Sequence, residues 1–100
     1  MSAPFTILYR WRLKKGKEEQ FAEAWTAVTE HYRRTAGSLG SRLHRGSDGI
    51  WYAYAQWPSD DARQKAFLEP GMETFALAMN EAVDERLQEV YLDIVSDRLG

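Results

Sequence analysis

Apolar residues recur along this chain with two different periods, and the order of those periods limits the folds open to it. From Phe5 to Leu13 they fall on every second residue, which places them on one face of a β-strand. From about Lys17 to Thr35 they recur every three or four residues, which makes one stripe of a helix. The chain is therefore expected to begin with a strand followed by a helix.

The rest of the chain repeats these patterns in another order. Ser47–Gly49 has the composition of a hairpin turn, and Pro58 closes the strand that follows it, because proline cannot continue a ladder. Ser59 is placed to cap a helix, which Glu69–Gly71 interrupts. The elements expected after the first helix are a strand over 40–46, a strand over 50–57, a helix over 59–67, a helix over 72–88 and a strand over 90–95.

The order β-α-β-β-α-β predicts an α+β fold of the ferredoxin-like type, with one sheet and both helical regions on one face. Crossovers between parallel strands are right-handed, which leaves little freedom in the topology. One hundred residues is the size of one domain, so we expect a single domain over 1–100.

Helices on one face leave the other face of the sheet uncovered. A chain with four Trp, five Tyr and four Phe has more rings than a domain of this size can bury. An exposed patch rich in rings marks an interaction site, and a second copy related by a two-fold axis would cover it, so we predict a homodimer. A monomer with a half-polar open face is the alternative. Within the interface, Asp93 is expected to pair with Arg10 or Arg12. The uncovered face is expected to carry Leu8, Tyr52, Tyr54, Tyr91 and Val95, with Arg10, Arg12 and Asp93 among them.

Charge and composition exclude several classes of function. The net charge of −2 gives no basic surface for nucleic acid. The apolar runs are too short to span a bilayer, and the N-terminus lacks the regions of a signal peptide, so no membrane association is expected. The chain has no cysteine, which excludes disulfides and thiolate chemistry. A cytoplasmic protein is expected.

Familiar catalytic and metal-binding patterns do not occur in this sequence. It has no HExxH, no GxSxG and no glycine-rich phosphate loop after a strand. His31 and His44 share no metal-ligand spacing and are interpreted as ordinary polar residues. Asp60 and Asp61 match the start of a helix better than a catalytic dyad. We therefore expect neither a cofactor nor a metal site.

The remaining candidates are aromatic side chains that share the layer between the sheet and the helices. Such a layer is either plain core or a flat pocket for a planar ligand. Trp57 stands at the end of a strand, where pockets open, and favours the pocket. The rings concerned are Tyr9, Trp11, Trp25, Trp51 and Trp57.

The run from Tyr54 to Ala62 (YAQWPSDDA) resembles the W-x-S/D-x-x-A signature of the antibiotic-biosynthesis monooxygenase family. Gly16, the segment Ala36–Gly40 and the segment Arg42–Arg45 also resemble the family pattern in order and spacing. The similarity covers the chain from about residue 5 to residue 95.

This resemblance implies a dimeric α+β barrel with a pocket between the sheet and the helices of each subunit. Several members oxidise aromatic polyketide-type substrates with O₂ and without metal or flavin. The implied function is a cofactor-independent monooxygenase acting on a planar aromatic or polyphenolic small molecule. The substrate-binding candidates are Trp57, Tyr9 and Trp25. The catalytic candidates are His31 as proton acceptor, Tyr32 as phenol and Asn80 as polar anchor.

Two alternatives stay open. One is a non-catalytic dimer that binds a small hydrophobic ligand or only a protein partner. The other is haem binding or degradation, as in a related branch of the family. Matching that branch to this chain puts Tyr9 where it has an asparagine, and Met79 where it has a histidine ligand. Haem binding would thus need Met79 or a histidine as the iron ligand.

Overall fold

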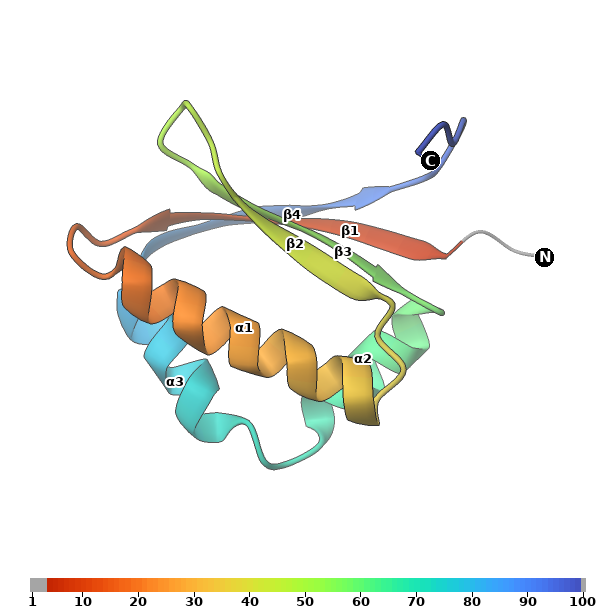
Figure 1. Cartoon of the computed structure of the whole chain (residues 1–100), viewed down its shortest axis with the longest axis horizontal. Coiled ribbons are helices and arrows are strands. Elements are labelled where there is room, and N and C mark those ends of the chain that lie inside the picture. Colours follow the sequence, from red (N-terminus) through yellow and green to blue (C-terminus); the bar gives the residue numbers. More distant parts are fainter. Residues whose placement is uncertain (1–3, 100) are drawn as a thin grey trace.

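The computed structural model describes residues 4–99, and its elements follow the order that the sequence predicts (Figure 1). The α+β fold of the ferredoxin-like type is confirmed, with the second helical region divided into two helices. No helix within residues 4–99 is both long and apolar enough to cross a bilayer. The elements are β1 (Phe5–Leu13), α1 (Glu18–Thr35), β2 (Gly40–Arg45), β3 (Trp51–Trp57), α2 (Asp60–Leu68), α3 (Glu73–Ala82) and β4 (Val83–Leu92).

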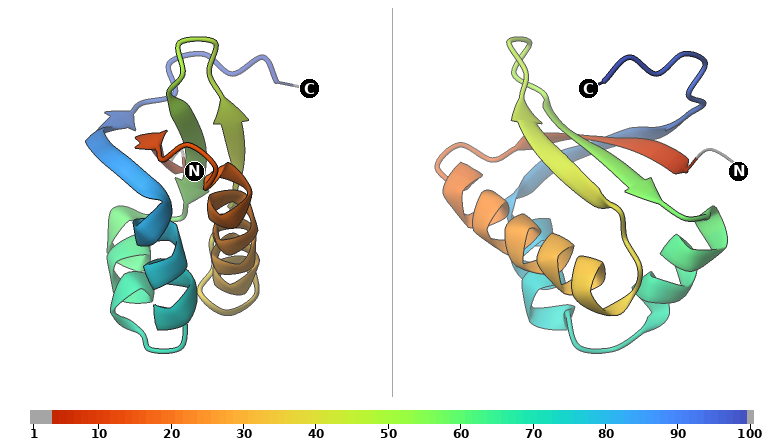
Figure 2. Two further views of the ribbon diagram at one scale, coloured as in Figure 1. Left: turned by 90° about the vertical axis from the view of Figure 1, so that its left-hand side faces the viewer. Right: turned by 45° about the vertical axis from the view of Figure 1, so that its right-hand side comes forward.

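The strands form one antiparallel sheet in the order β2-β3-β1-β4. Because β1 lies between β3 and β4, each βαβ unit passes over one strand, as the split ferredoxin-like layout requires. The helices all lie on one face of the sheet and leave the other face without a helix (Figure 1 and Figure 2). Anything bound between sheet and helices therefore lies on one side of the molecule only.

The core lies between β1, β3 and α1. The Trp11 ring meets the Phe21 ring edge to face, with 4.9 Å between their centroids, and Ala53 is buried beside them on β3. Ile7 and Trp11, on the same face of β1, are both buried, and Thr6 on the opposite face is buried as well. Ala55, on the same face of β3 as Ala53, leaves room above the sheet because its side chain is short.

The helix predicted over 72–88 is wrong in its second half, because α3 ends at Ala82 and β4 begins at Val83. Val83 has an extended backbone (φ −87°, ψ 123°), and the Ala82 carbonyl accepts a hydrogen bond from the Lys14 amide at 2.8 Å. Val83 and Leu87 suggested a longer helix because they are four residues apart. That spacing puts two side chains on one face of a helix and equally on one face of a strand.

The last strand also turns its side chains to the opposite faces from those predicted. Val90 pairs with Leu8, and Tyr91 pairs with the buried Ile7, so Tyr91 lies on the helix side of the sheet. The pairing of β1 with β4 contains register irregularities, and a shift of one residue reverses every side chain. Val95 lies beyond the end of β4. Neither Tyr91 nor Val95 therefore belongs to the uncovered face of the sheet.

The predicted pairing of Asp93 is wrong within the chain. Arg12 instead forms an ion pair with Glu85 at 3.2 Å, and Arg10 donates two hydrogen bonds to the Gln88 carbonyl at 2.8 and 3.1 Å. Asp93 follows the end of β4, which pairs with the start of β1, whereas both arginines lie toward the other end of β1. These charges are therefore separated by distance along the strand.

Candidate functional site

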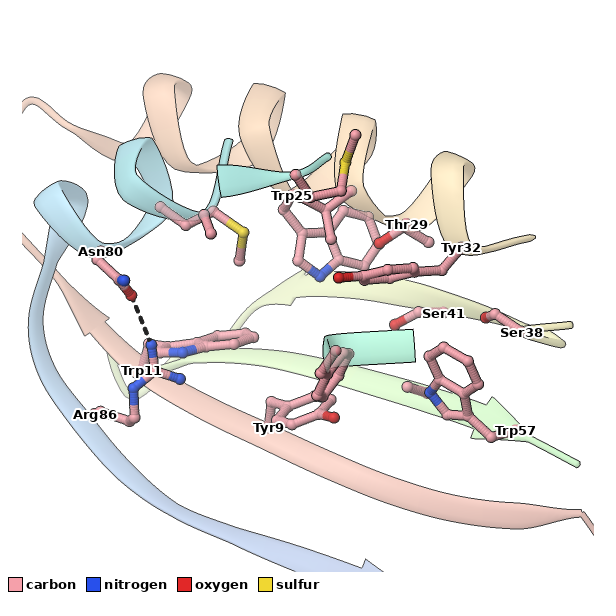
Figure 3. Close-up of a pocket in the computed structure, with 16 residues that line it drawn as sticks. Tyr9, Trp11, Trp25, Thr29, Tyr32, Ser38, Ser41, Trp57, Asn80 and Arg86 are labelled. Atoms are coloured by element: carbon pink, nitrogen blue, oxygen red, sulfur yellow. Dashed lines mark hydrogen bonds between the residues drawn. The ribbon is translucent and has the colours of Figure 1, made fainter. Parts of the chain in front are cut away.

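A cavity of about 350 Å³ lies between the sheet and the helices (Figure 3). This volume falls within the range of small-molecule sites. Its walls come from β1, β2, β3, β4 and all of the helices, so residues distant in the sequence meet there. The lining consists of Tyr9, Trp11, Trp25, Val28, Thr29, Tyr32, Ser38, Ser41, Ala55, Trp57, Phe67, Met72, Ala76, Met79, Asn80 and Arg86.

One wall of the cavity is a flat aromatic surface on β1. Tyr9 and Trp11 are two residues apart and therefore lie on the same face of the strand. Their rings stack with centroids 5.8 Å apart and an interplanar angle of 17°. Trp25 of α1 lines the cavity as well, and Figure 3 shows its indole on the helical side. The stacked rings thus present an apolar surface to the cavity.

Three rings gather at one end of the cavity. Tyr32 of α1 lies 5.9 Å from the Trp57 ring and 5.6 Å from the Phe67 ring, measured between centroids. Trp57 and Phe67 meet edge to face at 6.0 Å, and Trp57 is only 3% exposed. Edge-to-face pairs at these distances stabilise one another beyond the burial of their area. The end beside Trp57 is therefore rich in aromatic rings, with Ser38 and Ser41 among them.

The hydroxyl of Tyr9 contacts Arg63, a buried arginine on α2. Arg63 Nη1 donates a hydrogen bond to Tyr9 Oη at 3.0 Å. Arg63 itself pairs with Asp60 through Nε at 2.9 Å and Nη2 at 2.8 Å, and Glu89 of β4 lies 4.0 Å from Nη1. Because the Tyr9 oxygen accepts from Arg63, its own proton remains available to another acceptor.

Burial sets the protonation of the phenols in the cavity. It raises the pKa of Tyr9, and the hydrogen bond from Arg63 only partly offsets this rise. Burial also raises the pKa of Tyr32, with a further contribution from the negative charge of Glu73. For Arg63, burial lowers the pKa, but its hydrogen bonds to Tyr9 and Asp60 outweigh this, so its pKa is higher than usual. At neutral pH the two tyrosines are hydrogen-bond donors, and Arg63 is charged.

The end of the cavity away from Trp57 is polar. Figure 3 shows Asn80 and Arg86 there, joined by a hydrogen bond of 3.0 Å from Arg86 Nη2 to Asn80 Oδ1. Asn80 lies near the end of α3 and Arg86 on β4, so the two face each other across the junction between these elements. The cavity thus has an aromatic end and a cationic end.

The structure brings most of the sequence-predicted site residues to this cavity. Tyr9, Trp25 and Trp57, the expected ligand-binding rings, all line it. The two candidates Tyr32 and Asn80 line it as well. The exception is His31, which is absent from the lining and packs its ring edge to face against Tyr32 at 5.6 Å, also measured between centroids. Their catalytic roles stay predictions.

Two arginines important to the site were missed by reasoning from the sequence. Arg63 occurs in a polar stretch of helix, where a buried charge gives no hydrophobic signal; its one visible sign is Asp60, three residues earlier. Arg86 was placed in a helix that the structure ends four residues before it. Thr29, Ser38 and Ser41 were also missed, since small polar residues at these positions look like ordinary helix and loop residues.

The cavity offers little to a metal ion or to haem iron. Neither histidine of the chain lines it, and His44 is exposed on β2. Met79, the sulfur ligand considered for haem, lines it, and Met72 lines it as well. Within residues 4–99, no group of three or more His, Asp or Glu side chains is arranged to hold a metal ion.

The sequence model of the family described as antibiotic biosynthesis monooxygenase matches residues 4–78. No curated protein matches the chain in sequence. Among solved structures, the chain is similar to SnoaB, a cofactor-independent oxygenase from Streptomyces nogalater, at 17% identity and a TM-score of 0.81. That match covers 97% of this chain and 98% of SnoaB.

Two further solved structures share the fold. Rv0793 from Mycobacterium tuberculosis is 13% identical with a TM-score of 0.77, covering 97% of this chain and 100% of that one. PA3566 from Pseudomonas aeruginosa is 21% identical with a TM-score of 0.71, covering 92% of this chain and 96% of that one. At these identities the similarity establishes the arrangement of the backbone, while the family match rests on the sequence.

Proposed function

The chain belongs to the antibiotic biosynthesis monooxygenase family, and from that premise we propose that it oxygenates a planar aromatic or polyphenolic small molecule without a cofactor. The observation that carries this proposal is the cavity of about 350 Å³ beside Trp57, to whose lining Tyr, Trp and Phe side chains contribute six rings. A purely structural protein of this fold would fill that layer with side chains. SnoaB, to which the chain is similar in structure, is a cofactor-independent oxygenase, which agrees with the proposal.

The proposed reaction needs no external reductant. When a phenol becomes a quinone, one atom of O₂ enters the ring as a carbonyl oxygen and the other leaves as water. The two hydrogens of that water come from the substrate, which also supplies all of the electrons. The protein then has to hold the electron-rich ring, admit O₂ and keep bulk water away.

The side chains of the cavity suit this task through binding and hydrogen bonding. Trp57 and Trp25 provide ring surfaces against which a planar substrate can lie. The hydroxyls of Tyr9 and Tyr32 stay protonated at neutral pH and can donate to a substrate oxygen as negative charge develops on it. His31 is absent from the lining, so the proposed proton acceptor is one of the polar lining groups rather than this histidine.

Oxygen uptake tests this proposal. The protein is incubated with a panel of polycyclic phenols in the presence of a chelator, and consumption of O₂ is followed with an electrode. We expect wild type to consume O₂ and Trp57→Phe to consume it more slowly. Arg34→Gln, a change on the outer surface of α1, should consume O₂ at the wild-type rate. Uptake that no change in the cavity affects would show that the reaction occurs elsewhere.

A non-catalytic ligand-binding protein is the second candidate function. It is favoured by the absence of any histidine or carboxylate among the cavity-lining residues within 4–99, since general bases are most often drawn from these types. The same experiment separates the two. Binding of polycyclic phenols, seen as quenching of tryptophan fluorescence, without any O₂ uptake would favour this candidate.

We propose further that two copies of the chain associate through the uncovered face of the sheet. Leu8, Tyr52 and Tyr54 lie on this face, and they line a hollow to which Leu99 of the C-terminal segment also contributes. A face with large rings and no covering helix is the kind of surface that a second copy removes from water. Light scattering should give about twice the chain mass of 11.6 kDa. A single chain mass at all concentrations would contradict the dimer.

A further inference from the structure

The charge distribution in the cavity is one-sided. Arg86 is the only ionised side chain that lines it within residues 4–99, because the lining contains no Asp, Glu, Lys or His. The other titratable groups in the lining are Tyr9 and Tyr32, whose raised pKa values keep them neutral at neutral pH. The lining therefore offers a ligand one full positive charge, and the nearby carboxylates of Asp60, Glu73 and Glu89 lie outside the lining.

The backbone fixes the position of Arg86. In the pairing of β4 with β1, Arg86 lies opposite Trp11, so both side chains are on the helix side of the sheet. Asn80 lies two residues before Ala82, the fully buried last residue of α3. Strand β4 begins at the next residue, without a loop between the two elements. The hydrogen bond from the Lys14 amide to the Ala82 carbonyl holds this junction against β1. Arg86 and Asn80 are thus presented by a fixed turn rather than by a long loop.

The guanidinium of Arg86 has donors to spare. It carries five N–H groups, and one of its nitrogens donates to Asn80 Oδ1 at 3.0 Å. None of the ion pairs found within residues 4–99 includes Arg86. The planar fork of an arginine matches the two oxygens of a carboxylate, and such charge-assisted pairs are stronger than neutral hydrogen bonds.

We propose that the cavity selects planar aromatic ligands that carry a carboxylate, with the carboxylate on Arg86 and the rings toward Trp57. The inference rests on the proposed function and adds the charge of the ligand to it. Arg86 is exposed, so a carboxylate beside it keeps part of its hydration and avoids the cost of full burial. The amide of Asn80 positions the guanidinium through its oxygen, and its nitrogen remains free to donate to the same ligand.

Calorimetric titration with a matched pair of ligands tests this inference. The pair is anthracene carboxylic acid and its primary amide, which have nearly the same shape and differ in charge at neutral pH. We expect wild type to bind the acid about tenfold more tightly than the amide, at the lower end of what a charged hydrogen bond contributes. The preference should weaken as salt is added, because the pair is exposed to solvent.

Substitutions test whether Arg86 causes the preference for the acid over the amide. Arg86→Gln should bind acid and amide equally. Arg86→Lys should keep part of the preference, and Asn80→Ala should reduce it, since the guanidinium is then less well oriented. Arg34→Gln removes the same charge from the exposed surface of α1 and should keep the preference.

The outcomes separate this inference from the proposed function. Equal binding of acid and amide by wild type, or a preference that survives in Arg86→Gln, overturns the carboxylate inference while leaving an aromatic site in place. If wild type binds neither ligand and also binds no phenol of the oxygen-uptake panel, the carboxylate inference and the proposed function are both overturned. The comparison of the two ligands on wild type needs no variant and so does not depend on how any variant folds.

Discussion

Replacing Arg63 with methionine is expected to cost the folded protein about 3 kcal/mol. Arg63 is 6% exposed and ties three elements together: it lies on α2, bonds to Tyr9 on β1 and approaches Glu89 on β4. Its guanidinium also lies over the rings of Phe5, Phe67 and Tyr91, at 5.6, 5.6 and 5.9 Å from their centroids. Methionine keeps much of the contact with these rings and removes the charge.

The magnitude follows from the groups that the substitution leaves behind. Removing one partner of a buried ion pair costs about 3–5 kcal/mol, because the other charge stays buried and alone. The side chain of Asp60 is 33% exposed and can recover part of its hydration, which favours the lower end of that range. Asp60 also keeps its hydrogen bond from Gln64 at 2.9 Å. Tyr9 loses a donor to its hydroxyl, a loss of about 1 kcal/mol that is contained in the total.

Urea unfolding at neutral pH and one protein concentration measures this change. The midpoint should fall by more than about 1 M with the slope unchanged. Arg63→Lys should lose less, since it keeps the charge. In the double variant with Asp60→Asn, the combined loss should be smaller than the sum of the single losses by at least about 1 kcal/mol. A loss below about 1 kcal/mol in Arg63→Met, with additive effects in the double variant, would refute the argument that this charge is buried and coupled.

Three further changes have distinct expected outcomes. Trp57→Phe keeps an apolar ring and should fold normally while losing affinity for polycyclic phenols, measured by fluorescence titration; a loss of stability alone would make Trp57 structural. Gly46→Ala should destabilise the hairpin by about 1–3 kcal/mol in urea unfolding, because its Cβ would lie 2.6 Å from the Ile50 carbonyl oxygen. Burial raises the pKa of Tyr9 above 10.0, so the unfolded chain loses this proton first and stability should fall as the pH rises past that value. The fall should be smaller in Tyr9→Phe, and an equal fall in both proteins would contradict the burial of that hydroxyl.

The alternation along the first strand was sufficient to predict which side chains meet the helices. Ile7 and Trp11 are buried as expected, because a strand with two different faces has a unique orientation once one face is covered. The same alternation predicted that Tyr9 and Trp57 share the layer between the sheet and the helices. Whether that layer holds a cavity depends on small residues such as Ala55 and on the spacing of the helices, which no local pattern encodes.

The end of the chain was predicted less well, for two physical reasons. Apolar residues four positions apart satisfy both a helix and a strand, so the boundary between α3 and β4 could not be read from Val83 and Leu87. Register irregularities between β1 and β4 then reversed the faces of the last strand and moved Tyr91 to the helix side. Arg86 entered the cavity as a consequence of that earlier strand start, and its role was therefore invisible in the sequence.

A crystal structure with a bound polycyclic phenol tests the central claim most directly. The account predicts a planar ligand inside the cavity between sheet and helices, with its rings beside Trp57 and one edge directed toward Arg86. The same crystal should show the side chains of the lining close to their positions in Figure 3. A ligand bound only on the uncovered face of the sheet, or side chains that fill the cavity and exclude it, would contradict the account.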